Sequence, residues 1–488
     1  PEDPAVYDML SAGDSVGTFQ VESRAQMSML PRLKPRAFYD LVIEVAIVRP
    51  GPIQGGMVHP YLRRRNGQEP VTYPSPEVRQ ALERTLGVPI FQEQVMQLAI
   101  LAADFTPGEA DQLRRAMAAW KRRGGLGPFH ERLVGRMVAK GYARDYAEAI
   151  FRQIEGFGEY GFPESHAASF ALLVYTSAWL KYHHPDAFLA ALLNSQPMGF
   201  YAPAQLVRDA QAHGVSVRPV DVVYSHWETT LETTSEVTSE VTSEGSASPL
   251  WPRWPVRLGL SRVLGLSQAA AQRLVQARHQ APFESVEDLA RRASLDAQAL
   301  RLLAEADALR ALAPHRHQAA WAVAGVDTRA PRLLKASRTS EDEVQLHPPS
   351  EAMQTLADYR ATGLTLNQHP LALLRASLAA FKVQPAAQLR HCRPGQLARA
   401  SGLVTHRQRP ETAKGCVFVT LEDDTGSVNV IVWPALAQAQ RQPLLASTLL
   451  TVYGVWQSEG GVHHLVARKL VDHTTLLQGL SARSRDFR

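Results

Sequence analysis

Residues 415–434, GCVFVTLEDDTGSVNVIVWP, decide the fold of the second half of the chain. Apolar side chains recur at every second position on both sides of Asp424, Thr425 and Gly426. This period predicts two half-buried strands, and the three residues between them are of the types that tight turns prefer. The stretch therefore predicts a β-hairpin.

The same period of two extends outward from the hairpin. RASGLVTHRQRP (399–410) and STLLTVYGVWQSEGGVHHLVARKLVD (447–472) add about three strands, with a second turn at 459–461. Five strands with a basic first hairpin and aromatic side chains predict a small all-β barrel of the OB type over 396–475, although any five-stranded barrel fits the pattern.

OB barrels commonly bind single strands by base stacking and phosphate contacts. Arg407 and Arg409, in the first hairpin, are therefore candidate DNA contacts. We expect a linker with connecting helices over 313–395 before the barrel, and a short tail over 476–488 after it.

The first part of the chain is predicted to be mainly helical. Apolar residues recur at helical spacing in EAIFRQIEGF (148–157), and HAASFALLVYTSAWLKYHH (166–184) predicts a long helix that ends before Pro185. We expect one domain over residues 1–220.

Composition limits the class of protein. The 488 residues are 45% hydrophobic and 20% charged, which suits a globular protein of three or four domains. No apolar run approaches the ~18–20 residues that a membrane span requires. Two cysteines, Cys392 and Cys416, exclude a disulfide framework and a Cys-rich zinc site, so we expect an intracellular protein.

An acidic repeat interrupts the chain at 228–244, ETTLETTSEVTSEVTSE, with glutamates at a strict period of four. On a helix these like charges would stack one turn apart, and Thr, Ser and Val are poor helix formers. We predict a flexible acidic insertion within a loop over 221–255.

Residues 256–312 are predicted to form short helices joined by tight turns. VLGL (263–266), which contains Gly265, precedes a helix with Ser267 as the expected N-cap, and this is typical of a helix-hairpin-helix; an ordinary helical pair is the alternative. Such a turn can present backbone N–H groups to a DNA phosphate, so Gly265 and Ser267 are candidate DNA contacts.

A basic run, RRAMAAWKRR (114–123), carries five cations and no acid. A solvated helix face is the ordinary explanation, and a phosphate-contacting surface is the alternative. The net charge of +5 and the isoelectric point near 9.2 permit a nucleic-acid partner without requiring one.

Three glycines in GFGEYGFPESHAASF (156–170) have the spacing G-x-G-x-x-G. A dinucleotide fingerprint needs a strand before the first glycine and a helix at the third, and a kinase loop needs strands on both sides. The predicted helix before Gly156 and the proline at 163 exclude both.

What remains is a turn that leads into a helix start, where phosphate is favoured by the helix dipole and by N–H donors. Ser165 is the expected N-cap, His166 can donate to the same phosphate, and Tyr160 can stack on a base or sugar. A capping or packing role is the alternative for His166.

Five segments resemble, in order and spacing, the bacterial C-family DNA polymerases: the replicative polymerase III alpha subunits and their error-prone paralogues. They are TFQVESRAQMSMLPRLKP, AIVRPGPIQGGMVHPYLRRRNG, PIFQEQVMQLA, DQLRRAMAAWKRRGG and FGEYGFPESHAASFALLVYTSAWLKYHHP. The chain is more similar to the error-prone paralogue, because AAWKRRGG (118–125) replaces a Lys-rich run and Pro163-Glu164 replaces Asn-Lys.

The resemblance covers essentially the whole chain and implies that residues 1–220 are the fingers domain. The nucleotide-binding residues that it implies are Arg114, Arg115, Lys121, Tyr160, Ser165 and His166. The expected DNA contacts are Arg122, Arg123, Gly265, Ser267, Arg407 and Arg409. Arg49, Gln92 and Glu93 are weaker candidates with an expected structural role.

Nucleotidyl transfer in this family uses two divalent metal ions, held by an Asp-x-Asp pair and a third Asp. The resemblance implies Mg²⁺ as the cofactor of the full-length enzyme, yet this chain contains no Asp-x-Asp. We therefore assign no catalytic or metal-binding residue here. We expect a C-terminal fragment that lacks the palm, is inactive alone and still binds DNA.

The resemblance implies a DNA-directed DNA polymerase that acts in SOS-induced translesion synthesis and DNA repair, in the cytoplasm near the nucleoid. Its expected partners are primer-template DNA, deoxynucleotides, and accessory mutagenesis proteins that link it to the sliding clamp, with no membrane partner. The linker contains no clamp-binding peptide of the Gln-x-x-hydrophobic-aromatic type. A replicative alpha subunit and a non-catalytic DNA-binding scaffold remain as alternatives.

Overall fold

The computed structural model divides the chain into two compact units, Pro1–Tyr182 with Gly460–Val462, and His183–Glu459 with His463–Arg488. It describes residues 2–49, 53, 56–123, 127–156, 163–233, 252–327, 344–410, 413, 415–477 and 485–487. The first unit ends at Tyr182, whereas the sequence predicted one domain to residue 220. No helix in these ranges is long and apolar enough to cross a membrane.

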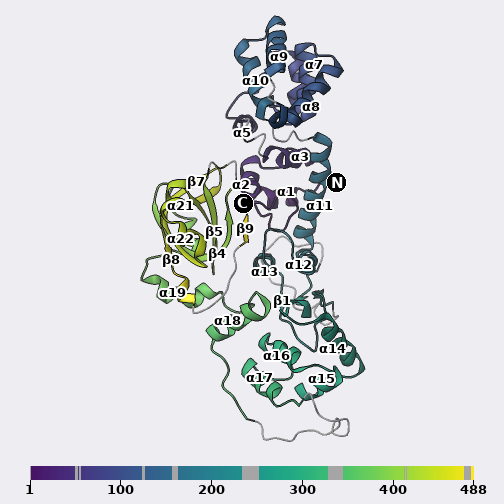
Figure 1. Cartoon of the computed structure of the whole chain (residues 1–488), viewed down its shortest axis with the longest axis vertical. Coiled ribbons are helices and arrows are strands. Elements are labelled where there is room, and N and C mark those ends of the chain that lie inside the picture. Colours follow the sequence, from purple (N-terminus) through teal and green to yellow (C-terminus); the bar gives the residue numbers. More distant parts are fainter. Residues whose placement is uncertain are drawn as a thin grey trace. The chain divides into compact units, whose positions relative to one another are not determined.

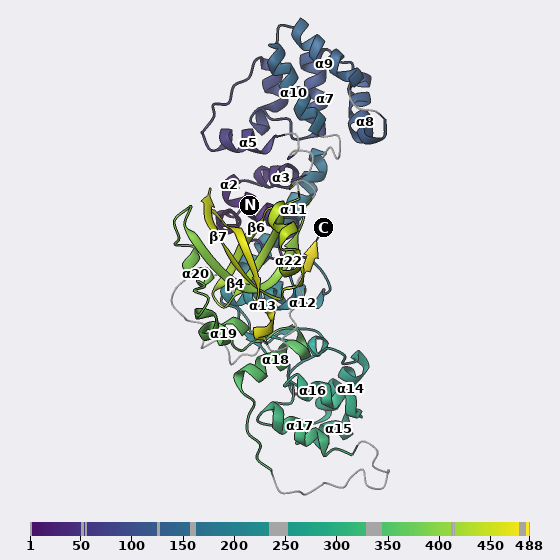
Figure 2. The same ribbon diagram turned by 60° about the vertical axis from the view of Figure 1, so that its left-hand side comes forward.

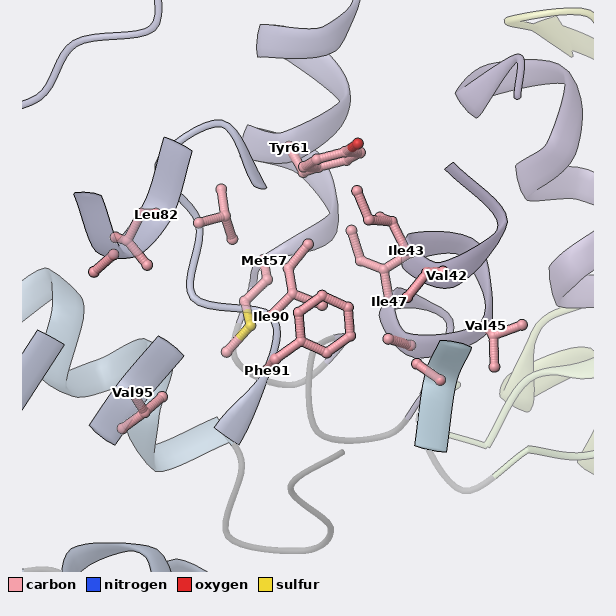
Figure 3. Packing of buried hydrophobic residues seen from close by; sticks show 14 of the residues in the cluster. Val42, Ile43, Val45, Ile47, Met57, Tyr61, Leu82, Ile90, Phe91 and Val95 are labelled. Atoms are coloured by element: carbon pink, nitrogen blue, oxygen red, sulfur yellow. The ribbon is translucent and has the colours of Figure 1, made fainter. Parts of the chain in front are cut away.

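The first unit is helical, as predicted. Its helices are α1 (Pro4–Ser11), α2 (Arg24–Leu33), α3 (Phe38–Ile47), α5 (Val58–Arg65), α6 (Pro76–Leu82), η1 (Glu83–Thr85), α7 (Gln92–Ala103), α8 (Pro107–Arg123), α9 (Gly127–Ala139), α10 (Arg144–Gly156) and α11 (Glu164–His183). Figure 3 shows side chains of α3, α5, α6 and α7 meeting in one apolar core, with Phe91 and Met57 near its centre.

A buried carboxylate joins α3 to α5. The carboxylate of Asp40 accepts hydrogen bonds from both Nη atoms of Arg65, at 2.7 and 2.8 Å, and from the backbone N–H of Arg36, at 2.8 Å. These donors compensate the charge of Asp40 within a helix whose buried side chains are mostly apolar, since residues 41–43 and 45–47 are all buried hydrophobics and Glu44 is the exception. The pair therefore fixes α5 against the most apolar helix of this core.

The second unit begins with helices and a small sheet. Its elements before the barrel are α12 (Pro185–Asn194), α13 (Pro203–Ala212), β1 (Val217–Arg218), β2 (Thr230–Leu231), β3 (Val256–Arg257), η4 (Leu260–Arg262), α14 (Gln268–Gln280), α15 (Val286–Arg292), α16 (Ala297–Glu305), α17 (Arg316–Ala324), α18 (Glu351–Thr362), α19 (Pro370–Ala379) and α20 (Ala386–Leu389). Figure 1 shows α14 to α17 gathered in one helical cluster.

The start of the acidic repeat is ordered, which corrects the prediction of a flexible insertion for Glu228 and Glu232. β2 lies between these two glutamates and pairs antiparallel with β3. Glu232 accepts from Nε of Arg257 at 2.6 Å and also pairs with Arg218. The prediction failed because two arginines from neighbouring strands compensate this charge; the rest of the repeat, from residue 234, lies outside the described residues.

The barrel is built from β4 (Leu397–Gln408), β5 (Val417–Asp423), β6 (Gly426–Val432), β7 (Leu449–Glu459) and β8 (Val462–Asp472), with β9 (Arg485–Phe487) beside β4. α21 (Pro434–Ala439), α22 (Arg441–Ala446) and η7 (Thr474–Leu477) complete it. The strand order is β5-β6-β8-β7-β4, and β4 pairs with both β5 and β7, which closes the sheet. Both predicted turns are confirmed, because β5 ends at Asp423 before β6 begins at Gly426 and β7 is followed directly by β8.

One carboxylate fastens the β5–β6 hairpin of the barrel to the preceding helices. Asp423 accepts the backbone N–H groups of Thr425 and Gly426 at 2.8 and 2.9 Å, closing the turn. It also accepts the N–H of Ala386 at 2.8 Å and Nη2 of Arg375 at 2.8 Å. Figure 2 shows α19 and α20, which carry these two residues and their neighbours, beside the barrel strands.

Burial alone would raise the pKa of Asp423, but hydrogen bonds from Ala386, Arg375 and Thr425 outweigh it and hold the pKa below its ordinary value. The carboxylate therefore stabilises the fold fully above about pH 5, and this stabilisation is lost as the pH falls through about 4 and below.

We predict that Asp423→Asn lowers the free energy of unfolding by about 2–3 kcal/mol at pH 7, because charge-assisted hydrogen bonds are lost. At pH 3 the difference from wild type should be smaller, since the stabilisation by a carboxylate with a lowered pKa declines once the pH falls below the unfolded-state value of about 3.9. Urea unfolding at both pH values, followed by tryptophan fluorescence, measures this. Glu305→Gln, at an exposed helical position, is the matched control; an equal deficit at both pH values would contradict the prediction.

Candidate functional site

α8, which carries the basic run, begins with a capping box. The N–H of Glu109 donates to Oγ1 of Thr106 at 3.3 Å, and the N–H of Thr106 donates to the Glu109 carboxylate at 2.8 Å. Arg136 of α9 lies 3.2 Å from this carboxylate, and Arg132 also pairs with it. The hydrogen bond from Arg136 is the main reason why the pKa of Glu109 falls to about 2.

The side chains of Arg114 and Arg115 project from the middle of α8, and the carboxylate of Asp111 forms an ion pair with both. Nη2 of Arg114 lies 2.8 Å from Oδ1 of Asp111, and Nη2 of Arg115 lies 2.7 Å from Oδ2. The side chains are 38% and 74% exposed, so both guanidinium groups still reach solvent. Hydrogen bonding to Arg114, followed by the charge of Arg115, lowers the pKa of Asp111.

Sequence reasoning missed Asp111 because it stands just before the basic run. Its signal was present in the spacing, since an acid at i with arginines at i+3 and i+4 lies on the same face of a helix. An incoming phosphate at this face has to compete with Asp111 for the two guanidinium groups.

The side chains of four other predicted residues lie outside the described part of the chain. Lys121, Arg122 and Arg123 form the last residues of α8, and their side chains lie outside the described part of the chain. Tyr160 lies within 157–162, also outside it.

The long predicted helix is α11, and it begins two residues earlier than expected. The carbonyl of Pro163 accepts the N–H of Ala167 at 3.1 Å, so Pro163 occupies the cap position and Ser165 lies inside the first turn. The prediction of Ser165 as N-cap is therefore wrong. Ser165 and His166 are both exposed, and the ring of His166 makes an edge contact with Phe170 at 4.3 Å between centroids.

Two acids already occupy the start of α11. The N–H of Glu164 donates to Oε2 of Glu93 at 3.0 Å. The Glu164 carboxylate accepts from the hydroxyl of Tyr39 at 2.9 Å and lies 2.8 Å from Nη1 of Arg84. Burial, together with this bond to Glu164, raises the pKa of Tyr39. The helix dipole is thus complemented within the fold, by a residue 71 positions away that no local pattern reveals.

The helix-hairpin-helix turn has the expected backbone. Gly265 has φ +86°, a conformation that favours glycine, and an added Cβ would lie 3.4 Å from Leu302. Ser267 is the N-cap of α14, as predicted, and its hydroxyl accepts from the N–H of Ala270 at 3.2 Å. The N–H of Leu264 donates to the carbonyl of Ala361 at 2.8 Å, so α18 occupies one donor of the turn.

The two barrel arginines have different environments. Arg409 is exposed, whereas Arg407 is 6% exposed and donates to the carbonyls of Leu444, at 2.7 Å, and Ser447. Arg407 therefore does not face a ligand, which corrects its assignment as a DNA contact. A register shift between Val404 and His406 in the β4–β5 pairing explains the failure, because a bulge breaks the strict alternation of faces.

No cluster of three or more metal-binding side chains lies within either unit, among the residues that the structure describes.

Gln92 is buried at the start of α7, and Arg49 donates to Gln20 at 3.3 Å and to the carbonyl of Val45 at 3.2 Å.

Comparisons with known proteins agree with this arrangement. Residues 1–141 match the finger domain of the bacterial DNA polymerase III alpha subunit, 214–319 a helix-hairpin-helix motif, and 398–472 an OB-fold nucleic-acid-binding domain. The predicted order of a mainly helical part followed by an OB barrel is confirmed.

Curated relatives cover the whole chain. The chain is 59% identical to an error-prone DNA polymerase of Bordetella bronchiseptica, 58% identical to one of Methylococcus capsulatus and 56% identical to one of Pseudomonas aeruginosa. These alignments include 100% of the chain and 45%, 47% and 46% of the respective relatives. The chain thus spans about half the length of the curated relatives it matches.

We predict that Ser267→Ala lowers the free energy of unfolding by about 1 kcal/mol, because the N–H of Ala270 loses its cap. Ser267→Asp should keep near wild-type stability, since Asp is an equally good N-cap and its charge complements the helix dipole. Thermal unfolding of both variants measures this, with an expected decrease of about 2 °C for Ala. A Ser267→Ala variant as stable as wild type would show that the cap contributes nothing.

Proposed function

Because the chain belongs to the bacterial C-family of DNA polymerases, in its error-prone branch, we propose that it supplies the fingers, helix-hairpin-helix and OB parts of an error-prone DNA polymerase. The observation that carries this proposal is the 56–59% identity over the whole chain to polymerases of that name. The proposed activity of the whole enzyme is template-directed addition of deoxynucleotides to a primer, in damage-induced translesion synthesis.

The incoming nucleotide is proposed to bind on the first unit, with Arg114 and Arg115 as its main cationic contacts. Two half-exposed or exposed guanidinium groups on one helix face suit the charge and geometry of a triphosphate. Asp111 keeps these groups compensated while no nucleotide is bound. His166, exposed in the first turn of α11, is a further proposed contact, acting as a hydrogen-bond donor to phosphate.

DNA is proposed to contact the second unit. The N-terminus of α14, with Ser267 as its cap, and the exposed Arg409 are the candidate phosphate contacts that the geometry leaves accessible. We further propose that accessory proteins link the whole enzyme to the sliding clamp, and that it works in the bacterial cytoplasm.

The described residues do not fit the two-metal site that nucleotidyl transfer needs. Neither unit contains a metal-binding cluster of its own among the residues that the structure describes, and the sequence has no Asp-x-Asp. We therefore propose that the carboxylates for Mg²⁺ belong to the part of the relatives that this chain does not span, and we derive no catalytic step here.

The 488-residue chain should show no primer extension with Mg²⁺ and all four deoxynucleotides, because its sequence has no Asp-x-Asp pair to hold the two metal ions. The same preparation should retard a primer-template duplex in a gel-shift assay, which shows that the chain is folded and active in binding. Extension by the chain alone would place the metal site within it and refute the proposal.

In an enzyme of the relatives' full length, Arg114→Ala and Arg115→Ala should each lower kcat/KM for deoxynucleotides by about 10- to 100-fold. Each removes one charge-assisted contact, which contributes about 1.5–3 kcal/mol. Asp111→Asn should lower the nucleotide KM, because it releases both arginines from competition. Steady-state kinetics measures these changes.

Arg152→Ala, an exposed cation of α10, is the matched control and should leave the kinetics unchanged. If Arg114→Ala and Arg115→Ala both keep wild-type kcat and KM, the two arginines do not contact the nucleotide.

A further inference from the structure

In OB barrels, oligonucleotides usually bind across the second and third strands, which here are β5 and β6. The fold covers part of this face. Glu422 of β5 lies 3.1 Å from Nη1 of Arg208 in α13 and 3.5 Å from Nε2 of His369, and its side chain is only 13% exposed. An acid enclosed by the chain's own helices leaves little room there for a phosphate.

A second outer face of the barrel, on β4, β7 and β8, has the opposite character. Arg399 of β4 stands directly opposite Tyr453 of β7 in the antiparallel register. The Cζ of Arg399 lies 5.1 Å from the centre of the Tyr453 ring, and Nζ of Lys469, from β8, lies 5.8 Å from it. One aromatic ring thus lies between cations from both adjacent strands; we name these three residues the Tyr453 face.

The neighbours of the Tyr453 face are apolar. Leu397 is 69% exposed and stands opposite Val455 in the same register. Ala398, Ala400 and Val452, which alternate with these residues, point into the core. A large exposed apolar side chain beside a cation-flanked ring is the combination that stacks bases and compensates phosphates.

The cations of this face have little competition from acids. Arg399 donates to the carbonyl of Phe381 at 3.3 Å, which leaves its charge uncompensated, and among the described residues neither Arg399 nor Lys469 has an ion-pair partner. This differs from Arg114 and Arg115, which share Asp111. A phosphate can therefore bind here without breaking an existing ion pair.

We propose that the Tyr453 face binds single-stranded DNA. One base stacks against the Tyr453 ring and the Arg399 guanidinium, and the adjacent phosphates contact Arg399 and Lys469. The proposal rests on the proposed function only in that the chain binds DNA. It requires a single strand because the face of a base is hidden by its neighbours in a duplex.

Fluorescence anisotropy of the 488-residue chain with a labelled oligothymidylate, over a range of salt concentrations, tests the proposal. Tyr453→Leu should weaken binding about tenfold, whereas Tyr453→Phe should bind within about twofold of wild type, because stacking requires only the ring. The double variant Arg399→Gln/Lys469→Gln should reduce the slope of log K against log salt by about 1.4, from about 0.7 for each phosphate contact on a single strand.

Arg441→Gln, an exposed cation of α22 in the same barrel, is the matched control and should change neither quantity. Lys469→Gln alone changes an exposed residue, so a loss of salt dependence there cannot come from unfolding. If all Tyr453-face variants bind like wild type, or lose duplex and single-strand affinity equally, the Tyr453 face is not this site. If wild type binds neither DNA form, the proposed function itself fails.

Discussion

The structure depends on guanidinium groups held by carboxylates from neighbouring elements. Arg65 with Asp40 joins two helices of the first unit, and Arg375 with Asp423 fastens a helix to the barrel. Each carboxylate also accepts backbone N–H groups, so removing one would leave several donors unpaired at once. The chain has 52 basic and 47 acidic residues, and the arrangement of ion pairs decides which positive charge remains available.

Local pattern predicts the elements in which neighbours in sequence decide the structure. The hairpin turn after Asp423, the left-handed Gly265 and the cap at Ser267 each follow from a few adjacent residues, and the structure has all three. Pairings over long distances are what sequence reasoning missed. Glu93 reaches the start of α11 from 71 residues away, and the sequence offers it only as a weaker site candidate with an expected structural role.

Two further corrections have local causes that a strict period conceals. A register shift in β4 accompanies the burial of Arg407, which its place in a basic hairpin had made a candidate DNA contact. Glu232 is ordered because Arg218 and Arg257 lie on strands that only the folded sheet brings together. In both cases the charge of the side chain is evident from the sequence, whereas the groups that surround it are evident only from the folded structure.

In the sequence, the arginines and lysines cannot be told apart as phosphate contacts. In the structure they differ in the interactions that each would lose on binding a phosphate. Arg407 is buried against carbonyls and can serve only the fold. In the proposed function, Arg114 and Arg115 would exchange one anion, Asp111, for another, so their net gain on binding would be small unless the ligand carries more charge than a single carboxylate, as a triphosphate does. Lys469, beside an aromatic ring and without an acid partner among the described residues, loses no ion pair on binding. Under the two proposals, the singly charged phosphates of a DNA backbone would be better matched to the barrel, and a compact triphosphate to α8.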